Sequence, residues 1–366
     1  MSNDAMMGVR GVIGMPGQRL RRGAWPDKGA VALLALLAGL AWPTTTRAQA
    51  LELQLPIACT PGKDCFVQNF PDADAAPASA HDFACSAATY DGHDGTDIRV
   101  LSIDAAKGVR VLAAAAGTVR GARDGVPDHF MRTAADKAAL KGRECGNGVA
   151  IVHAGGWETQ YCHMRQGSLR VRQGQAVQAG DPLGDVGLSG ETQFAHVHLT
   201  VRHDGKPIDP FTGKRLGEGT ANATCPAAGG GLLWAPAVAV ALGAPQTVVL
   251  ETAFSDHTPA ADALEQGHAD IAPPTAASDT LELFGRIMHL RAGDLVHIRI
   301  AFPEGPPLDQ TSEPTARDGA IRILAGARKR SGPHWPTGRY MGVVEVLRAG
   351  APAAKGEAFL EIGTGP

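Results

Sequence analysis

The sequence predicts an all-β protein built from two antiparallel β domains. Short apolar segments recur from residue 93 to residue 362, and glycines and other turn-forming residues separate them. Helical periodicity is absent over most of this range. Many short strands with frequent turns are typical of antiparallel sheets. The chain has 366 residues, which is enough for two domains with their own cores.

The first 50 residues have the pattern of a secretory signal peptide. Arginines within Arg19-Leu20-Arg21-Arg22, together with Lys28, precede an apolar run over 30–42, and Ala48-Gln49-Ala50 is a small-x-small cleavage signal. The apolar run is shorter than the roughly twenty residues that a transmembrane helix needs. We therefore expect a signal peptide over 1–50 and a periplasmic or secreted mature chain from Leu51, with no stable membrane span after cleavage. An uncleaved anchor is the alternative.

The cysteines agree with an exported protein. All six follow the signal, and an even number in an exported chain predicts disulfides. Cys145 and Cys162 flank an expected hairpin and are the favoured pair, and Cys59 with Cys65 is a plausible local pair. This leaves Cys85 with Cys225, although six cysteines allow fifteen connectivities. A cysteine-ligated zinc is disfavoured because the chain has no Cys-x-x-Cys pair.

Residues 51–92 read as an irregular lead-in because proline, glycine and small residues interrupt them. A β domain is expected over 93–225, with a hairpin around Gly155-Gly156 and a polar insertion at 121–144 that has helical character from Ala134 to Leu140. Its strands are expected near 109–114, 117–119, 148–153, 158–163, 171–187, 196–201 and 208–210.

A second, smaller β domain follows a linker at 226–245. The apolar stretch from Leu232 to Leu242 is too short to span a membrane and is expected to be a strand or a packed connection. An immunoglobulin-like β-sandwich is expected over 246–366, with strands near 246–254, 279–287, 293–302, 338–347 and 356–362. Its histidines lack ligand spacing and are read as surface or structural residues: His257, His268, His289, His297 and His334.

The charge of the chain argues against nucleic acid as a partner. The formal net charge is −3, and no basic stripe stands out beyond the N-terminus.

Two short motifs carry the chemistry of the first domain. His93 and Asp97 lie four residues apart among glycines, and His196 and His198 lie two apart in an expected strand. Residues at even spacing in an extended chain point to one face, so each pair can project together. A catalytic zinc takes three N or O ligands and keeps one position open for water, whose pKa falls toward about 7. The set His93, Asp97 and His198 would suffice, and His196 and His163 would remain for proton transfer.

From about residue 90 to 211 the chain resembles the M23 family of lysostaphin-type, LytM-like metallopeptidases. Several motifs in the same order carry the resemblance: Gly92-His93-Asp94-Gly95-Thr96-Asp97, Gly117-Thr118-Val119, Tyr161-Cys162-His163-Met164, Val171-Arg172-Gln173-Gly174, Val177-Gln178-Ala179-Gly180 and His196-Val197-His198.

The resemblance implies a LytM-like peptidase domain with one zinc ion, held by His93, Asp97 and His198. It implies two catalytic histidines, His196 as the base and His163 as the residue that stabilises the tetrahedral intermediate. The implied substrate is a peptide stem or cross-link of peptidoglycan. The run at 190–195 and the insertion at 121–144 depart from the family pattern, which puts substrate preference in doubt more than activity.

Alternatives remain open at this point. A catalytically silent LytM-like regulator would bind and activate another cell-wall hydrolase, although such members lack ligands that this chain keeps. Autoinhibition would place Asp72, Asp74 or His81 on the metal. A biotinyl or lipoyl carrier module would explain the rhythm of 171–187, but no lysine lies between 171 and 200. The C-terminal domain is left open as a cell-wall or protein contact, a spacer or a stabilising domain.

Overall fold

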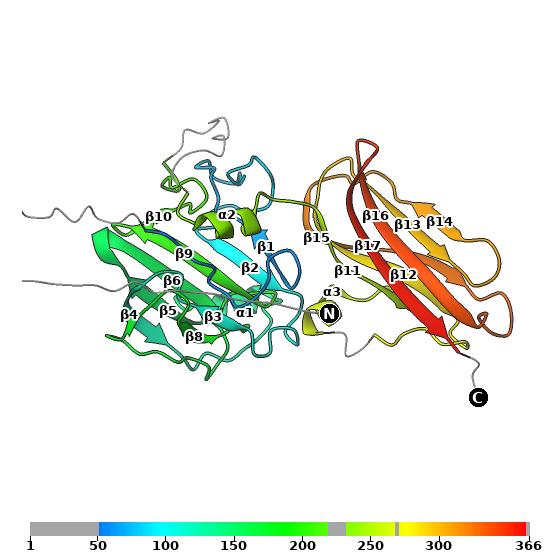
Figure 1. The fold of residues 1–366 in the computed structure, drawn as a ribbon, viewed down its shortest axis with the longest axis horizontal. Helices are drawn as coiled ribbons and strands as arrows, with labels where there is room; N and C mark the ends of the chain where they lie inside the picture. The colour runs from blue at the N-terminus through cyan, green and yellow to red at the C-terminus, as the bar shows by residue number, and fades with distance from the viewer. Residues whose placement is uncertain (1–50, 219–231, 268–270, 364–366) are drawn as a thin grey trace, which may run out of the picture. The chain divides into compact units, whose positions relative to one another are not determined.

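A computed structural model describes residues 51–218, 232–267 and 271–363. The expected signal peptide, Cys225 and the small-residue stretch Pro226–Gly231 lie outside these ranges. Residues Arg47–Pro366 fall into one compact unit, and strands dominate it (Figure 1). Of the helices in the described ranges, none is long and apolar enough to cross a membrane.

The first domain is built on an eight-stranded antiparallel sheet. The strand order is β1-β2-β9-β6-β5-β4-β7, and β10 pairs with β9. A separate pair, β3 with β8, lies beside it. The strands are β1 (Cys65–Asn69), β2 (Thr96–Val100), β3 (Arg110–Leu112), β4 (Gly117–Arg123), β5 (Asn147–Val152), β6 (Trp157–Met164), β7 (Ala176–Val177), β8 (Pro182–Asp185), β9 (His196–His203) and β10 (Lys206–Ile208).

Strands β2 and β9 form the centre of the functional face. In β9 the apolar residues Val197, Leu199 and Val201 are buried in the core of the domain. The alternate positions of β9 carry histidine, threonine and arginine on the other face, as the period of two predicts. Antiparallel pairing places Asp97 of β2 opposite His198 of β9.

The lead-in is part of the sheet rather than wholly irregular. Its strand β1 is an edge strand that pairs with β2, and Leu53 forms a bridge to Trp234 far along the chain. The sequence did not indicate this strand because its partners lie elsewhere in the chain and its turn-rich flanks dominate the pattern.

The helices are short. The expected helix in the insertion is α1 (Ala134–Ala139), which begins with a capping box on Thr133 and Asp136. The stretch from Leu232 to Leu242, expected as a strand or packed connection, ends in helix α2 (Pro236–Leu242) and is packed, because Leu233, Trp234 and Leu242 are buried in the core of the first domain. The first residue of α2 is a proline, whose missing N–H costs nothing at a helix start.

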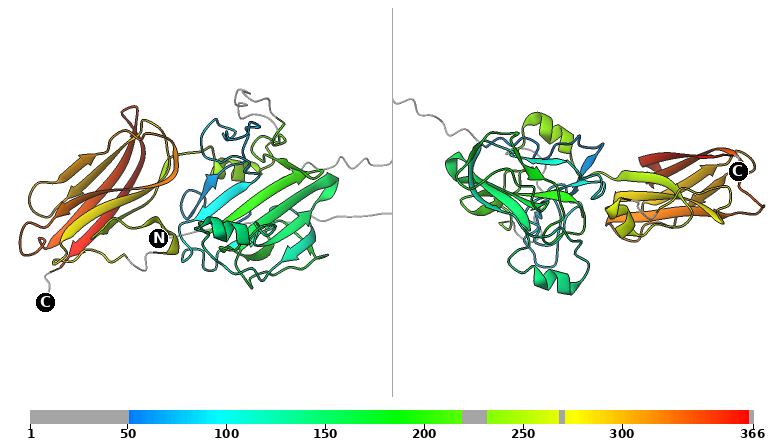
Figure 2. Two further views of the ribbon diagram at one scale, coloured as in Figure 1. Left: turned by 180° about the vertical axis from the view of Figure 1, so that it is seen from behind. Right: turned by 90° about the horizontal axis from the view of Figure 1, so that it is seen from below.

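The C-terminal domain is a seven-stranded β-sandwich with its own core (Figure 2). One sheet has the order β11-β12-β15 and the other β14-β13-β16-β17, and all pairs are antiparallel. Its elements are β11 (Val248–Ser255), α3 (Ala261–Gln266), β12 (Thr280–Leu290), β13 (Leu295–Ala301), β14 (Leu308–Thr311), β15 (Gly319–Lys329), β16 (Gly338–Arg348) and β17 (Ala351–Ile362). The sequence indicated five of the strands but not β14, β15 or helix α3. Both missed strands are largely exposed or half-buried, so they lack a clear apolar alternation.

Candidate metal centre and active site

Three donor atoms converge beside β2 and β9. His93 Nε2 lies 3.2 Å from Asp97 Oδ1 and 3.3 Å from His198 Nδ1. His198 Nδ1 lies 2.8 Å from Asp97 Oδ1. The three residues form a group that could hold a metal ion.

The donor set fits a zinc ion. Ligand atoms at about 2.0–2.1 Å from a tetrahedral zinc lie about 3.3–3.4 Å from one another, close to the separations seen here. Two imidazole nitrogens and one carboxylate oxygen are also a ligand set that zinc accepts.

Hydrogen bonds on the outer side of His93, Asp97 and His198 fix the orientation of each side chain. His93 Nδ1–H donates to the Phe70 carbonyl at 2.7 Å, which leaves the Nε2 lone pair for the centre. Asp97 Oδ2 accepts a bond of 2.8 Å from Asn69. His198 Nε2–H donates to Thr200 Oγ1 at 2.9 Å.

Gly95 makes room for the His198 ring. A Cβ at this position would come within 2.5 Å of His198 Nε2 and 2.7 Å of the Leu199 carbonyl oxygen. The loop before β2 can therefore lie against the His198 ring only where position 95 has no side chain.

The electrostatics of the group favour a bound cation. Burial alone would raise the pKa of Asp97, but the charges and hydrogen bonds of His93, His196 and His198 hold it well below its ordinary value. Burial would likewise lower the pKa of His198, but hydrogen bonds and negative charge from Asp94 and Asp97 raise it to about 9.

His163 and His196 flank the three donors. Their Nδ1–H groups donate to the carbonyls of Ser189 (2.8 Å) and Phe194 (2.9 Å). Each Nε2 is thereby left as the reactive nitrogen. The two ring centroids are 4.6 Å apart, and His196 Nε2 lies 3.4 Å from Asp97 Oδ1.

His163 has an unusual backbone conformation and a lowered pKa. Its φ is 62°, a left-handed conformation that non-glycine residues rarely adopt. Burial, followed by the positive charges of His196 and His198, lowers its pKa well below the ordinary value. The His163 ring is therefore neutral in the free chain.

The group opens into a groove of about 430 Å³, which is within the range of ligand-binding sites. Its lining is mostly polar and includes three acidic residues and one arginine: Tyr90, Asp94, Glu144, Cys145, Gln160, Cys162, His163, Glu191, His198, Thr200 and Arg202. A second cavity of about 290 Å³, over β4 and β5, shares Cys145 and Gln160 with this groove.

The structure thus brings together all five residues that the sequence singled out. Sequence reasoning missed Asn69, Thr200 and Asp94, which orient Asp97 and His198. Thr200 was detectable, because it lies two residues after His198 and shares its face of β9. Nothing in the sequence pointed to Asn69.

The other cysteines and acidic residues lie around the site. The disulfides Cys59–Cys65 and Cys145–Cys162 are the pairs that the sequence favoured, and Cys85 is also disulfide-bonded. The Asp72 carboxylate accepts bonds from the backbone N–H groups of Asp74, His81 and Gly92, within the lead-in.

A buried His/Asp group in an antiparallel β domain, open to a polar groove, defines a candidate metallohydrolase. Residues 91–210 match the model of peptidase family M23. This segment of the chain therefore belongs to peptidase family M23.

Curated relatives match the same region. The chain is 32% identical to the cell division protein DipM of Caulobacter vibrioides over 116 residues, which is 30% of this chain and 16% of that protein. It is 37% identical over 85 residues to the DD-carboxypeptidase/endopeptidase Mpg of Neisseria meningitidis, covering 22% of this chain and 19% of Mpg. It is 34% identical over 104 residues to a lipoprotein NlpD/LppB homolog of Pseudomonas aeruginosa, covering 28% of this chain and 29% of that protein. The chain thus spans less than a third of the length of each of these relatives.

Solved structures resemble the chain more distantly. The catalytic domain of the prophage-encoded M23 protein EnpA from Enterococcus faecalis is 21% identical, with a TM-score of 0.29, over 44% of this chain and 97% of EnpA's. A chain of the SpoIIIAH and SpoIIQ complex is 24% identical, with a TM-score of 0.31. The match covers 43% of this chain and 97% of that one.

Proposed function

We propose that the protein is a zinc-dependent endopeptidase that hydrolyses peptide bonds in the stems or cross-links of peptidoglycan. One observation carries the proposal. The donor atoms of His93, Asp97 and His198 converge beside two imidazoles whose Nε2 atoms accept no hydrogen bond among the described residues.

His93, Asp97 and His198 would hold one zinc ion through Nε2, Oδ1 and Nδ1. When bound, this ion supplies Lewis acidity, which activates water and polarises a peptide carbonyl. Asn69, Thr200 and the Phe70 carbonyl keep the three ligands oriented.

His196 is the proposed general base. Its Nδ1–H is held by the Phe194 carbonyl, so Nε2 carries the lone pair that accepts a proton from water. The proton can then pass from Nε2 to the leaving amine.

His163 is the proposed stabiliser of the tetrahedral intermediate. Its low pKa keeps it neutral in the free chain. Negative charge that develops on the substrate oxygen raises the pKa of His163, so that Nε2 takes up a proton from solvent, donates a hydrogen bond to that oxygen and releases the proton when the intermediate collapses.

The groove supports a peptide as substrate. Its volume suits a few residues of an extended chain, and Asp94, Glu144 and Glu191 make its rim more acidic than basic. The Cys145–Cys162 disulfide lies in the lining and is consistent with work in an oxidising periplasmic or extracellular location.

The test is to measure zinc content together with fragment release from purified peptidoglycan sacculi, with and without a chelator. We expect about one zinc per chain and chelator-sensitive release of peptide-cleaved fragments, whose masses identify the bond. The matched control is His203→Ala, which removes a histidine from the far end of β9. Zinc without release from several wall types would favour the silent regulator, and absence of zinc would refute the proposal.

A further inference from the structure

A buried ion group joins the peptidase domain to the C-terminal sandwich. Glu265 of α3 accepts hydrogen bonds of 2.8 and 3.1 Å from Arg99 of β2 and also pairs with Arg286 of β12. The two arginines are 0% and 1% exposed. Within the described ranges, neither arginine forms an ion pair with a second carboxylate. Glu265 is therefore the counter-ion that both share.

Arg99 lies beside the candidate metal centre. Residues two apart on a strand share a face, so Arg99 lies on the same face of β2 as Asp97, and it pairs in register with His196 of β9. Its guanidinium lies 5.1 Å from the centre of the Phe194 ring. That ring stacks on His196 at 4.3 Å. A continuous set of contacts thus runs from Glu265 to the proposed base.

A second set of contacts runs through β1. Arg99 Nη1 donates to Gln68 Oε1 at 2.5 Å, and His289 of the sandwich donates to the Gln68 carbonyl at 2.7 Å. The next residue, Asn69, holds Asp97. The sandwich therefore fixes the strand that orients a metal ligand.

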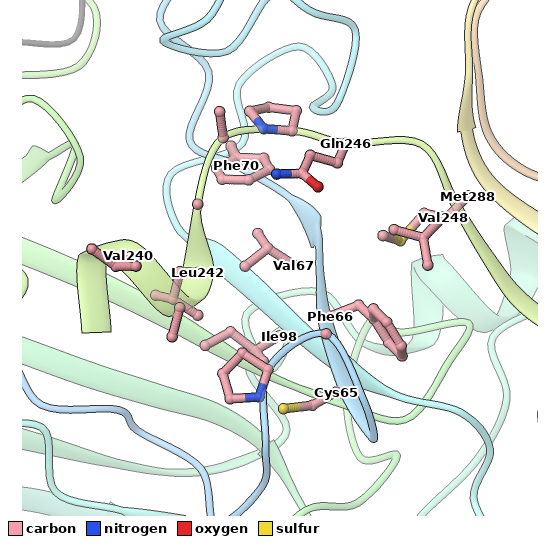
Figure 3. Close-up of a pocket in the computed structure, with 16 residues that line it drawn as sticks. Cys65, Phe66, Val67, Phe70, Ile98, Val240, Leu242, Gln246, Val248 and Met288 are labelled. Atoms are coloured by element: carbon pink, nitrogen blue, oxygen red, sulfur yellow. The ribbon is translucent and has the colours of Figure 1, made fainter. Parts of the chain in front are cut away.

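Apolar packing supports the same contact. Phe66 of β1 forms a buried cluster with Leu250 and Met288 of the sandwich. Beside this cluster lies a small pocket of about 110 Å³. Figure 3 shows Phe66 together with Val248 and Met288 at its edge. The contact thus combines buried charge with apolar surface.

We propose that Glu265 is a positioning residue for the metal centre, so that the C-terminal sandwich completes the hydrolytic unit. This inference rests on the proposed zinc site. Loss of the Glu265 charge leaves Arg99, whose guanidinium lies over the Phe194 ring beside His196, without its counter-ion and frees it to move. Both effects disfavour a bound dication.

The experiment compares Glu265→Gln with Asp262→Asn in the full-length chain. Asp262 lies on the same helix and pairs with Arg132 at 2.9 Å, but both side chains are about half exposed, so its loss has little effect. Zinc affinity is measured by chelator competition at a temperature where circular dichroism shows each variant folded. The visible spectrum of the Co²⁺-loaded protein reports the ligand geometry.

We expect zinc affinity to fall about tenfold in Glu265→Gln and to stay unchanged in Asp262→Asn. The Co²⁺ spectrum is expected to change only in the first variant. If Glu265→Gln does not fold, Glu265→Asp is used, which keeps the charge on a shorter side chain. Its zinc affinity should also fall, but by less.

A lower melting temperature with unchanged zinc affinity and Co²⁺ spectrum would overturn the inference, because Glu265 would then be structural only. Absence of zinc from the wild-type chain would instead refute the proposed function, so the two failures are distinguishable.

Discussion

Strand β2 contributes Asp97 and Arg99 to two different buried charge groups. The groups differ in the cations that surround their carboxylates, which are those of Asp97 and Glu265. Asp97 Oδ1 lies within 2.8–3.4 Å of nitrogens of His93, His196 and His198. Glu265 is surrounded by two guanidiniums. Imidazoles exchange protons and bind metals near neutral pH, whereas guanidiniums stay charged and need a fixed partner. The first group is therefore suited to binding, and the second to joining two domains.

The largest effect is expected from His198→Ala. This change removes one of three proposed ligands, so both zinc and fragment release should be lost. Metal analysis and sacculus digestion measure the two losses, with His203→Ala as the control from the same strand. A variant that keeps about one zinc per chain would show that His198 is not a ligand.

His196→Ala separates the proposed base from the ligands. Because His196 is outside the proposed ligand set, the variant should keep its zinc while turnover falls by about 10²–10⁴-fold. Single-turnover assays on the zinc-loaded variant check this. Loss of the metal along with turnover would mean that the roles of His196 and His198 are misassigned.

Asn69→Ala tests whether the hydrogen bond from Asn69 to Asp97 orients this proposed ligand. The change leaves Asp97 Oδ2 without its donor, so zinc affinity should fall about 10–100-fold while the fold is retained. Chelator competition measures the affinity. Asn147→Ala is unsuitable as a control because Asn147 bridges three backbone groups near the groove, so His203→Ala again serves.

Asp209→Asn tests a third buried carboxylate, one with only neutral hydrogen-bond donors. Burial raises the pKa of Asp209 from 3.8 to about 6, despite bonds from Phe211 and Thr212. The folded state therefore holds the carboxyl proton of Asp209 more tightly than the unfolded state does. Stability is then lost as the pH rises from about 4 to about 6. The loss is about 3 kcal/mol at about 1.4 kcal/mol per pKa unit.

Urea unfolding of both chains between pH 4 and pH 7 measures this effect. The wild type should lose stability relative to Asp209→Asn as the pH rises, while zinc content stays equal. Parallel pH profiles for the two chains would contradict the assignment.

The sequence predicted the parts of the protein whose information is local. Alternation in β9 placed His196 and His198 on one face, and the glycines at 155 and 156 marked the hairpin between β5 and β6. The helical character expected from Ala134 to Leu140 is also local and corresponds to α1.

Features that depend on distant partners were not predictable. Asn69 gains its role only because β1 pairs with β2, and a short edge strand in a turn-rich segment carries no period of its own. Arg99 and Glu265 are 166 residues apart, and each alone resembles an ordinary surface charge in the sequence. His289 was read as a scattered histidine, yet its Nε2–H donates to the Gln68 carbonyl across the two domains.

The long separation between the proposed zinc ligands also bears on when the protein can act. His93 and His198 are 105 residues apart, and Asp97 and His198 are 101 apart. Their donors meet only when β9 has joined β2 in the sheet, a non-local pairing that forms late compared with local hairpins. A chain that is still being synthesised, or that crosses a membrane unfolded, therefore lacks the assembled group of His93, Asp97 and His198. For the proposed endopeptidase, the order of assembly alone would prevent activity until the chain has folded.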